Sequence, residues 1–203
     1  MAKIPSRFSY LQAQPLAPVM VRLAMDLLGT LETPGTPDNR VIVGWADEIN
    51  NAFPGRPYHK WAADWYNDDS VPWCGLFVGA ICARTGLDYR APPKNYLAAL
   101  AWADWGDPVQ FKGKEGLRLN EIRIGDIGVL VRKGGGHVGI IVGVTSDGKN
   151  IIMLGGNQGD KVSFAEFPVE RLYAVRRPIY REIPAGARHV RISSTGEVSK
   201  GEQ

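Results

Sequence analysis

The sequence predicts an α+β fold in which helices in the first half of the chain precede an antiparallel sheet in the second half. Apolar residues recur at helical spacing before residue 106, and short apolar segments separated by glycine turns follow residue 120. Helices first and strands afterwards is the order typical of α+β domains. With 203 residues, 44% of them hydrophobic, the chain is long enough for one domain with its own core.

The boundaries of these elements follow from turn residues. Pro34-Gly35 and Gly86 end two helical stretches, and Asp147-Gly148 marks a tight hairpin turn. The expected helices are 18–33, 39–51, 74–85 and 96–105. The expected strands are 127–131, 137–144 and 151–154, with 161–164 and 172–176 as candidates for two more.

Charge and hydropathy exclude several classes of function. The net charge of +3 comes from scattered Lys and Arg, and the sequence contains no nucleic-acid-binding motif, so we expect no nucleic-acid partner. No apolar run approaches the roughly 18 to 20 residues that span a membrane, so no integral membrane segment is expected. The first residues lack the continuous apolar stretch of a signal peptide.

Cys74 is the candidate nucleophile. It follows Pro72-Trp73 and begins a helix, where unpaired backbone N–H groups and the helix dipole favour the thiolate. Cys82 lies eight residues further along the same helix, which puts the two Cα atoms about 12 Å apart. A disulfide needs less than about 7 Å, so we expect two free thiols. Free cysteine is also common as a small buried apolar residue, which is the alternative interpretation of both.

A cysteine nucleophile needs a base, and His137 is the best placed of the three histidines because it opens a strand directly after three glycines. Asn157 follows the next strand. Antiparallel pairing would bring it to the same end of the sheet as His137, where its amide could orient the imidazole. Gln158 and Asp160 are alternatives for that role. The histidines are too dispersed to suggest a metal site, so neither a metal nor another cofactor is expected.

Several segments of the sequence resemble those of the NlpC/P60–CHAP superfamily of cysteine peptidases and amidases, and they occur in the same order along the chain. An early segment with Glu32 and Asn39 resembles the N-terminal motif of a small subgroup found in phage lysins and wall-targeting effectors. The other matching segments are Pro72-Trp73-Cys74-Gly75-Leu76-Phe77-Val78, Gly125-Asp126-Ile127-Gly128, His137-Val138-Gly139-Ile140 and Leu154-Gly155-Gly156-Asn157-Gln158.

The resemblance implies a papain-like fold and hydrolysis of amide bonds in peptidoglycan, by an endopeptidase or an N-acetylmuramoyl-L-alanine amidase. Cys74 would attack the carbonyl carbon, His137 would transfer the proton, and Asn157 would orient the imidazole. The Cys74 backbone N–H would hold part of the oxyanion. Candidates for further oxyanion or substrate-groove contacts are Tyr66, Asp69 and Trp73.

The expected organisation is an irregular leader over 1–17, the catalytic domain over 18–183 and a flexible tail over 184–203. Without a signal peptide, the protein would be made in the cytoplasm and would reach the cell wall or periplasm through a phage holin, a virion or a secretion apparatus. Peptidoglycan is the expected partner, with a cognate immunity protein if the chain is an effector. The alternatives are a non-catalytic wall-binding or virion structural module, and a Cys–His acyltransferase or deamidase that modifies proteins.

Overall fold

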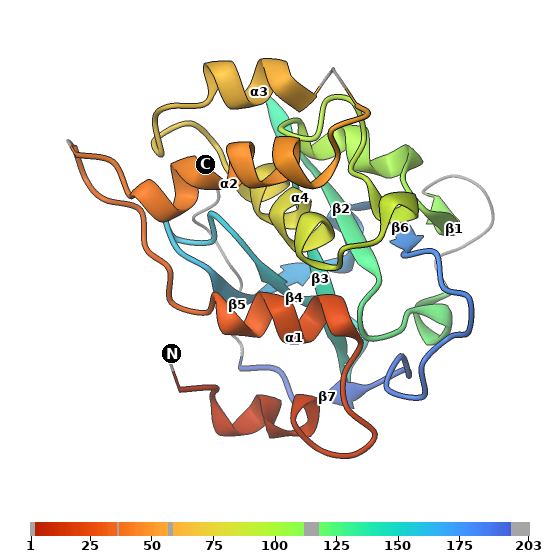
Figure 1. The fold of residues 1–203 in the computed structure, drawn as a ribbon. Coiled ribbons are helices and arrows are strands. Elements are labelled where there is room, and N and C mark those ends of the chain that lie inside the picture. The colour runs from red at the N-terminus through yellow and green to blue at the C-terminus, as the bar shows by residue number, and fades with distance from the viewer. Residues whose placement is uncertain (1–2, 36, 57–58, 112–117, 196–203) are drawn as a thin grey trace.

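The computed structural model describes residues 3–35, 37–56, 59–111 and 118–195. It confirms the α+β class, with the main helices packed on one face of a largely antiparallel sheet (Figure 1). The helices are α1 Val19–Asp26, α2 Arg40–Ala52, α3 Lys60–Trp65 and α4 Cys74–Arg84, with 3₁₀ helices η1 Ser6–Leu11, η3 Asp88–Arg90, η4 Ala99–Asp104, η5 Leu119–Glu121 and η6 Val169–Arg171. Within the described ranges, no helix combines the length and apolar character needed to cross a bilayer.

The sheet places β3 at its centre. The strands are β1 Asp107–Phe111, β2 Ile127–Arg132, β3 Gly135–Thr145, β4 Asn150–Gly155, β5 Ser163–Pro168, β6 Leu172–Arg177 and β7 Arg191–Ile192. Their order is β1-β6-β2-β3-β4-β5, and β7 pairs with β3 in parallel. The three consecutive hairpins from β2 to β5 form the predicted meander. Tight turns join β2 to β3 and β3 to β4, and a longer connection over 156–162 joins β4 to β5.

Alternation along β3 divides the core between the two faces of the sheet. Val138 and Ile140 belong to the cluster that includes α1, α2 and α4. Ile141 belongs to a second cluster on the other face, together with Phe167 and Met153. Because successive side chains of a strand point to opposite faces of the sheet, β3 contributes to both cores.

Two helices are shorter than the sequence predicts. The first ends at Asp26, because Gly29 takes a φ of 85° and its N–H bonds the carbonyl of Val162 instead of continuing the helix. The segment 96–105 forms a helix only over η4, with 3₁₀ geometry. Strand β1 was not predicted, since its first residues, Asp107 and Pro108, have the composition of a turn.

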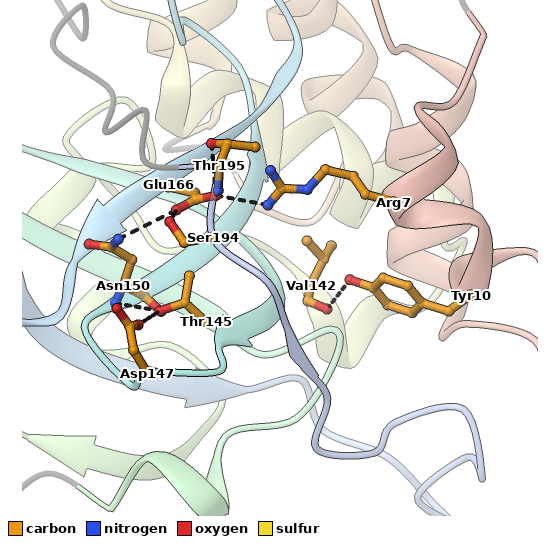
Figure 2. Close-up of polar contacts among 9 residues, drawn as sticks. All are labelled: Arg7, Tyr10, Val142, Thr145, Asp147, Asn150, Glu166, Ser194 and Thr195. Carbon is orange, nitrogen blue, oxygen red and sulfur yellow. Dashed lines mark hydrogen bonds and ion pairs between the residues drawn. The ribbon is translucent and has the colours of Figure 1, made fainter.

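The N-terminal segment is not an irregular leader. Residues Ser6–Leu11 form η1, and Phe8 is buried, with its ring stacked on that of Phe164 at a centroid distance of 3.9 Å. The hydroxyl of Tyr10 donates a hydrogen bond of 2.8 Å to the carbonyl of Val142 (Figure 2). This segment is therefore part of the folded domain.

The tail is likewise packed as far as residue 195, and 196–203 lie outside the described residues. Beyond β7, the hydroxyl of Ser194 and the backbone N–H of Thr195 bond the carboxylate of Glu166 at 2.6 and 2.9 Å. Arg7 bonds the same carboxylate at 2.8 Å from the other end of the chain (Figure 2). The expected flexible tail is thus wrong for 184–195, whose polar residues find a buried partner in β5.

Candidate active site

The predicted nucleophile is the first residue of α4. Trp73 precedes the helix as its N-cap, and every residue from Cys74 to Ala83 is buried. Gly75 lets the start of α4 pack directly against the backbone of Tyr96 and Leu97, because a methyl group at this position would overlap their carbonyls. Packing therefore fixes the start of α4, and with it the position of the thiol.

Burial governs the protonation of this thiol. Cys74 is 3% exposed, and loss of solvent raises its pKa, although backbone N–H groups of Val138, Gly75 and Cys74 itself hydrogen-bond the sulfur and lower it in part. The net direction is upward. The expectation that the helix N-terminus favours the thiolate is thus only half right, because desolvation outweighs the N–H groups. A base must remove the proton before attack. Both cysteines are free.

The contact between the Cys74 sulfur and the backbone of Val138 places the nucleophile at the start of β3. The sulfur lies against the backbone N–H of Val138, the residue that follows His137. His137 is fully buried, and its ring packs on that of Phe167 at a centroid distance of 5.2 Å. The start of α4 and the start of β3 therefore meet at this point, although Cys74 and Val138 are 64 residues apart in sequence.

Gln158, rather than Asn157, contacts the imidazole. Its Oε1 lies 3.1 Å from Nε2 of His137. Its own amide nitrogen donates to the carbonyl of Ser163, and its backbone N–H donates to the carbonyl of Lys161 at 3.0 Å. The hydroxyl of Ser163 in turn donates to the backbone carbonyl of Gln158 at 3.0 Å. This residue, which sequence reasoning placed second to Asn157, is the one positioned to orient His137.

Asn157 shapes the turn between β4 and β5. It has a φ of 56°, a left-handed conformation that Asn tolerates better than most residues. Its side-chain amide is buried, and neither amide atom has a hydrogen-bond partner among the described residues. Just before it, Gly156 lies against α4, where a methyl group would come within 2.6 Å of Trp73 and Phe77. The turn thus holds the end of β4 against the nucleophile helix.

Tyr66, Asp69 and Trp73 are at most 2% exposed and form the framework beneath the site rather than the lining of a groove. The hydroxyl of Tyr66 donates to the carbonyl of Val71 at 2.8 Å, and burial raises its pKa. The indole N–H of Trp73 donates to Glu32 at 3.0 Å. These contacts give the three residues a structural role, and their expected oxyanion or groove contacts stay a prediction.

Asp69 performs that structural role through backbone contacts. Its carboxylate accepts N–H groups of Thr33 and Asn39 at 3.0 and 2.8 Å. Asn39 also caps α2, its side chain accepting from Val41 at 2.8 Å. Together with the Trp73–Glu32 bond, these contacts attach Glu32, Thr33 and Asn39 of the early motif to the segment that leads into the nucleophile.

Carboxylates of Asp38, Asp68 and Asp69 converge within 4.8 Å of one another in the described part of the chain. Asp69 is committed to the contacts above. Asp38 accepts the backbone N–H of Asp69 at 3.2 Å, and Asp68 accepts that of Ser70 at 2.8 Å. These bonds account for the cluster as a set of turn-stabilising caps.

Compared with known proteins, the chain matches no family model, and neither a curated protein nor a solved structure matches it significantly. Function must therefore be inferred from the residues and their geometry.

Proposed function

We propose that this protein is a cysteine hydrolase of papain-like, NlpC/P60–CHAP type that cleaves amide bonds in bacterial peptidoglycan. The observation that carries the proposal is the position of Cys74 at the start of α4, with its sulfur against the backbone N–H of Val138. Val138 directly follows His137 in the chain, and the imidazole of His137 contacts Gln158. The resembling segments around Glu32, Cys74, His137 and Gln158 are far apart in sequence but are joined by contacts here, which supports a common site.

The hydrogen bonds of Gln158 select the tautomer of the base. Because its amide nitrogen faces the carbonyl of Ser163, its Oε1 faces His137 and can only accept. Nε2 of His137 must then carry the hydrogen. In the neutral imidazole the lone pair is left on Nδ1, which becomes the basic nitrogen.

The reaction follows from these roles. Nδ1 of His137 takes the proton of the Cys74 thiol, and the thiolate attacks the amide carbonyl carbon. The backbone N–H of Cys74 donates to the oxyanion. The imidazolium then protonates the amine as the C–N bond breaks, which leaves a thioester on Cys74. Water, deprotonated by Nδ1, hydrolyses the thioester to a carboxylic acid and restores the thiol.

Purified peptidoglycan incubated with the wild type and with Cys74→Ala tests this proposal, with the fragments identified by mass spectrometry. New amine and carboxyl ends from the wild type alone are expected, and their identity names the bond. Cys82→Ala is the matched control, because Cys82 is also a buried thiol of α4 but lies in the helix interior. If wild-type protein releases no fragments from walls of several chemotypes, the peptidoglycan assignment fails.

A further inference from the structure

Two tryptophans of α3 are exposed in a chain that buries its other tryptophans. Trp61 is 41% exposed and Trp65 is 55% exposed. The other four of the six are at most 7% exposed: Trp45, Trp73, Trp102 and Trp105. Core packing explains those four, but it does not explain a pair of large apolar rings left in solvent.

The exposed pair is continuous with the segment that leads into the candidate nucleophile. The rings of Trp61 and Trp65 lie 6.3 Å apart with a 42° tilt, and the ring of Trp65 lies 6.3 Å from that of Tyr66 at 64°. The buried hydroxyl of Tyr66 bonds the carbonyl of Val71, three residues before the nucleophile. An aromatic row, Trp61–Trp65–Tyr66, therefore leads from the surface to the segment that precedes the nucleophile.

We propose that Trp61 and Trp65 form a subsite for a hexopyranose ring of the peptidoglycan glycan strand. The subsite rests on the proposed function and specifies its substrate as a peptide still attached to sugar. The C–H groups on one face of a pyranose ring are apolar and slightly positive, and they complement the electron-rich face of an indole. In peptidoglycan the stem peptide is joined to the sugar through a lactyl group, so a sugar lies close to the first amides of the stem.

Charge around the pair favours a neutral ligand. Lys60 and Asp64, one helical turn apart on α3, neutralise each other with N–O distances of 2.7 Å. The exposed carboxylate of Asp68 follows shortly after the helix. An anionic membrane surface would need unpaired basic residues here, whereas sugar hydroxyls can bond both partners of a mixed-charge rim.

The test measures binding in a Cys74→Ala background, so that it does not depend on catalysis. The probe is a tetramer of β-1,4-linked N-acetylglucosamine, followed by tryptophan fluorescence and calorimetry. Saturable binding is expected, weakened at least tenfold by Trp61→Ala combined with Trp65→Ala. A variant with Trp65→Phe alone keeps an aromatic face and should retain most of the binding affinity of the parent. Tyr89→Ala is the matched control, because Tyr89 is 39% exposed on η3 and should leave binding unchanged.

Equal binding by the parent and the double variant overturns the subsite, as does the absence of saturable binding in the parent. Binding of the parent to anionic phospholipid vesicles but not to the tetramer overturns it in favour of a membrane contact. Circular dichroism checks that each variant is folded. Failure of the wild type to cleave peptidoglycan, with tetramer binding intact, would instead refute the hydrolase and leave the sugar site standing.

Discussion

Nε2 of His137 lies 3.1 Å from Oε1 of Gln158, on a side chain whose other end is bonded to the backbone of β5. Gln158 is 3% exposed, so its orientation is fixed by the fold rather than by solvent. Removing such a partner leaves the imidazole free to change tautomer and ring orientation. We therefore expect Gln158 to position the imidazole of His137, a role that activity measurements on folded variants can test.

Gln158→Ala is expected to lower kcat by about 10- to 100-fold with little change in KM, the effect seen when metal-binding histidines lose the partner that orients their ring. Gln158→Glu should keep the contact but raise the pKa of His137, so the acidic limb of the pH–rate profile moves to higher pH. Asn157→Gly is the control: glycine accepts the positive φ, and activity should be retained. A loss with Asn157→Gly and none with Gln158→Ala would assign the role to Asn157 instead.

The choice between these two residues shows where sequence reasoning ends. The place of the orienting group, just after β4, could be predicted from the spacing of strands and glycines. Which of two adjacent amides turns toward His137 depends on the left-handed φ of Asn157 and on the contacts of Gln158 with Lys161 and Ser163. These contacts belong to the folded turn, and no local pattern encodes them.

The chain ends were mispredicted for a similar reason. Residues 1–17 show no periodicity, and residues 184–195 are polar as well, so the sequence predicts an irregular leader and a flexible tail. Their order comes from long-range partners, above all the buried Glu166 that bonds Arg7 at one end and Thr195 at the other. By contrast, the start of α4 at Cys74 was predicted correctly, because proline, glycine and apolar spacing define it locally.

The buried thiol gives a pH prediction. Because the pKa of Cys74 is raised above its ordinary value near 9.0, alkylation by iodoacetamide should be slow at pH 7 and rise steeply above pH 9. Peptide mapping by mass spectrometry identifies the modified cysteine, with Cys82, also buried and of raised pKa, as the internal comparison. A rate already at its plateau at pH 7 would mean a resting thiolate–imidazolium pair and contradict the raised pKa.

The carboxylate of Glu166 should contribute to stability through both ends of the chain. Glu166→Gln is expected to lower the free energy of unfolding by about 1–3 kcal/mol at pH 7, since hydrogen bonds to a charged group are weakened. Burial alone would raise the pKa of Glu166, but bonds from Ser194, Thr195 and Arg7 outweigh it and lower the pKa. Urea unfolding of wild type and variant measures the difference.

The sign of the pH dependence follows from that lowered pKa. Glu166 stabilises the folded state above its unfolded pKa near 4.5, and this contribution disappears as the pH falls through its folded value. The difference between wild type and Glu166→Gln should therefore shrink in acid. Glu182→Gln, at an exposed carboxylate, should not measurably change the free energy of unfolding at pH 7 or in acid. A difference that grows on acidification would refute this role.

Asp126, from the Gly-Asp motif before β2, should be structural rather than catalytic. Its carboxylate makes two 2.8 Å bonds to Arg177 and one of 2.8 Å to the N–H of Arg123, and its side chain is 2% exposed. Asp126→Ala leaves the largely buried Arg177 guanidinium without its partner, so a loss of about 3–5 kcal/mol is expected. Asp47→Ala, at an exposed site on α2, should change stability by less than about 0.5 kcal/mol.

The double variant Asp126→Ala/Arg177→Met separates the value of the pair from the cost of an unpaired charge. Because the methionine removes that charge and keeps apolar contacts, chemical denaturation should show it to be more stable than Asp126→Ala alone. Its activity per folded molecule should match that of the wild type, since neither residue contacts Cys74 or His137 in the bonds described above. A folded double variant with activity lost would place Asp126 in the catalytic machinery.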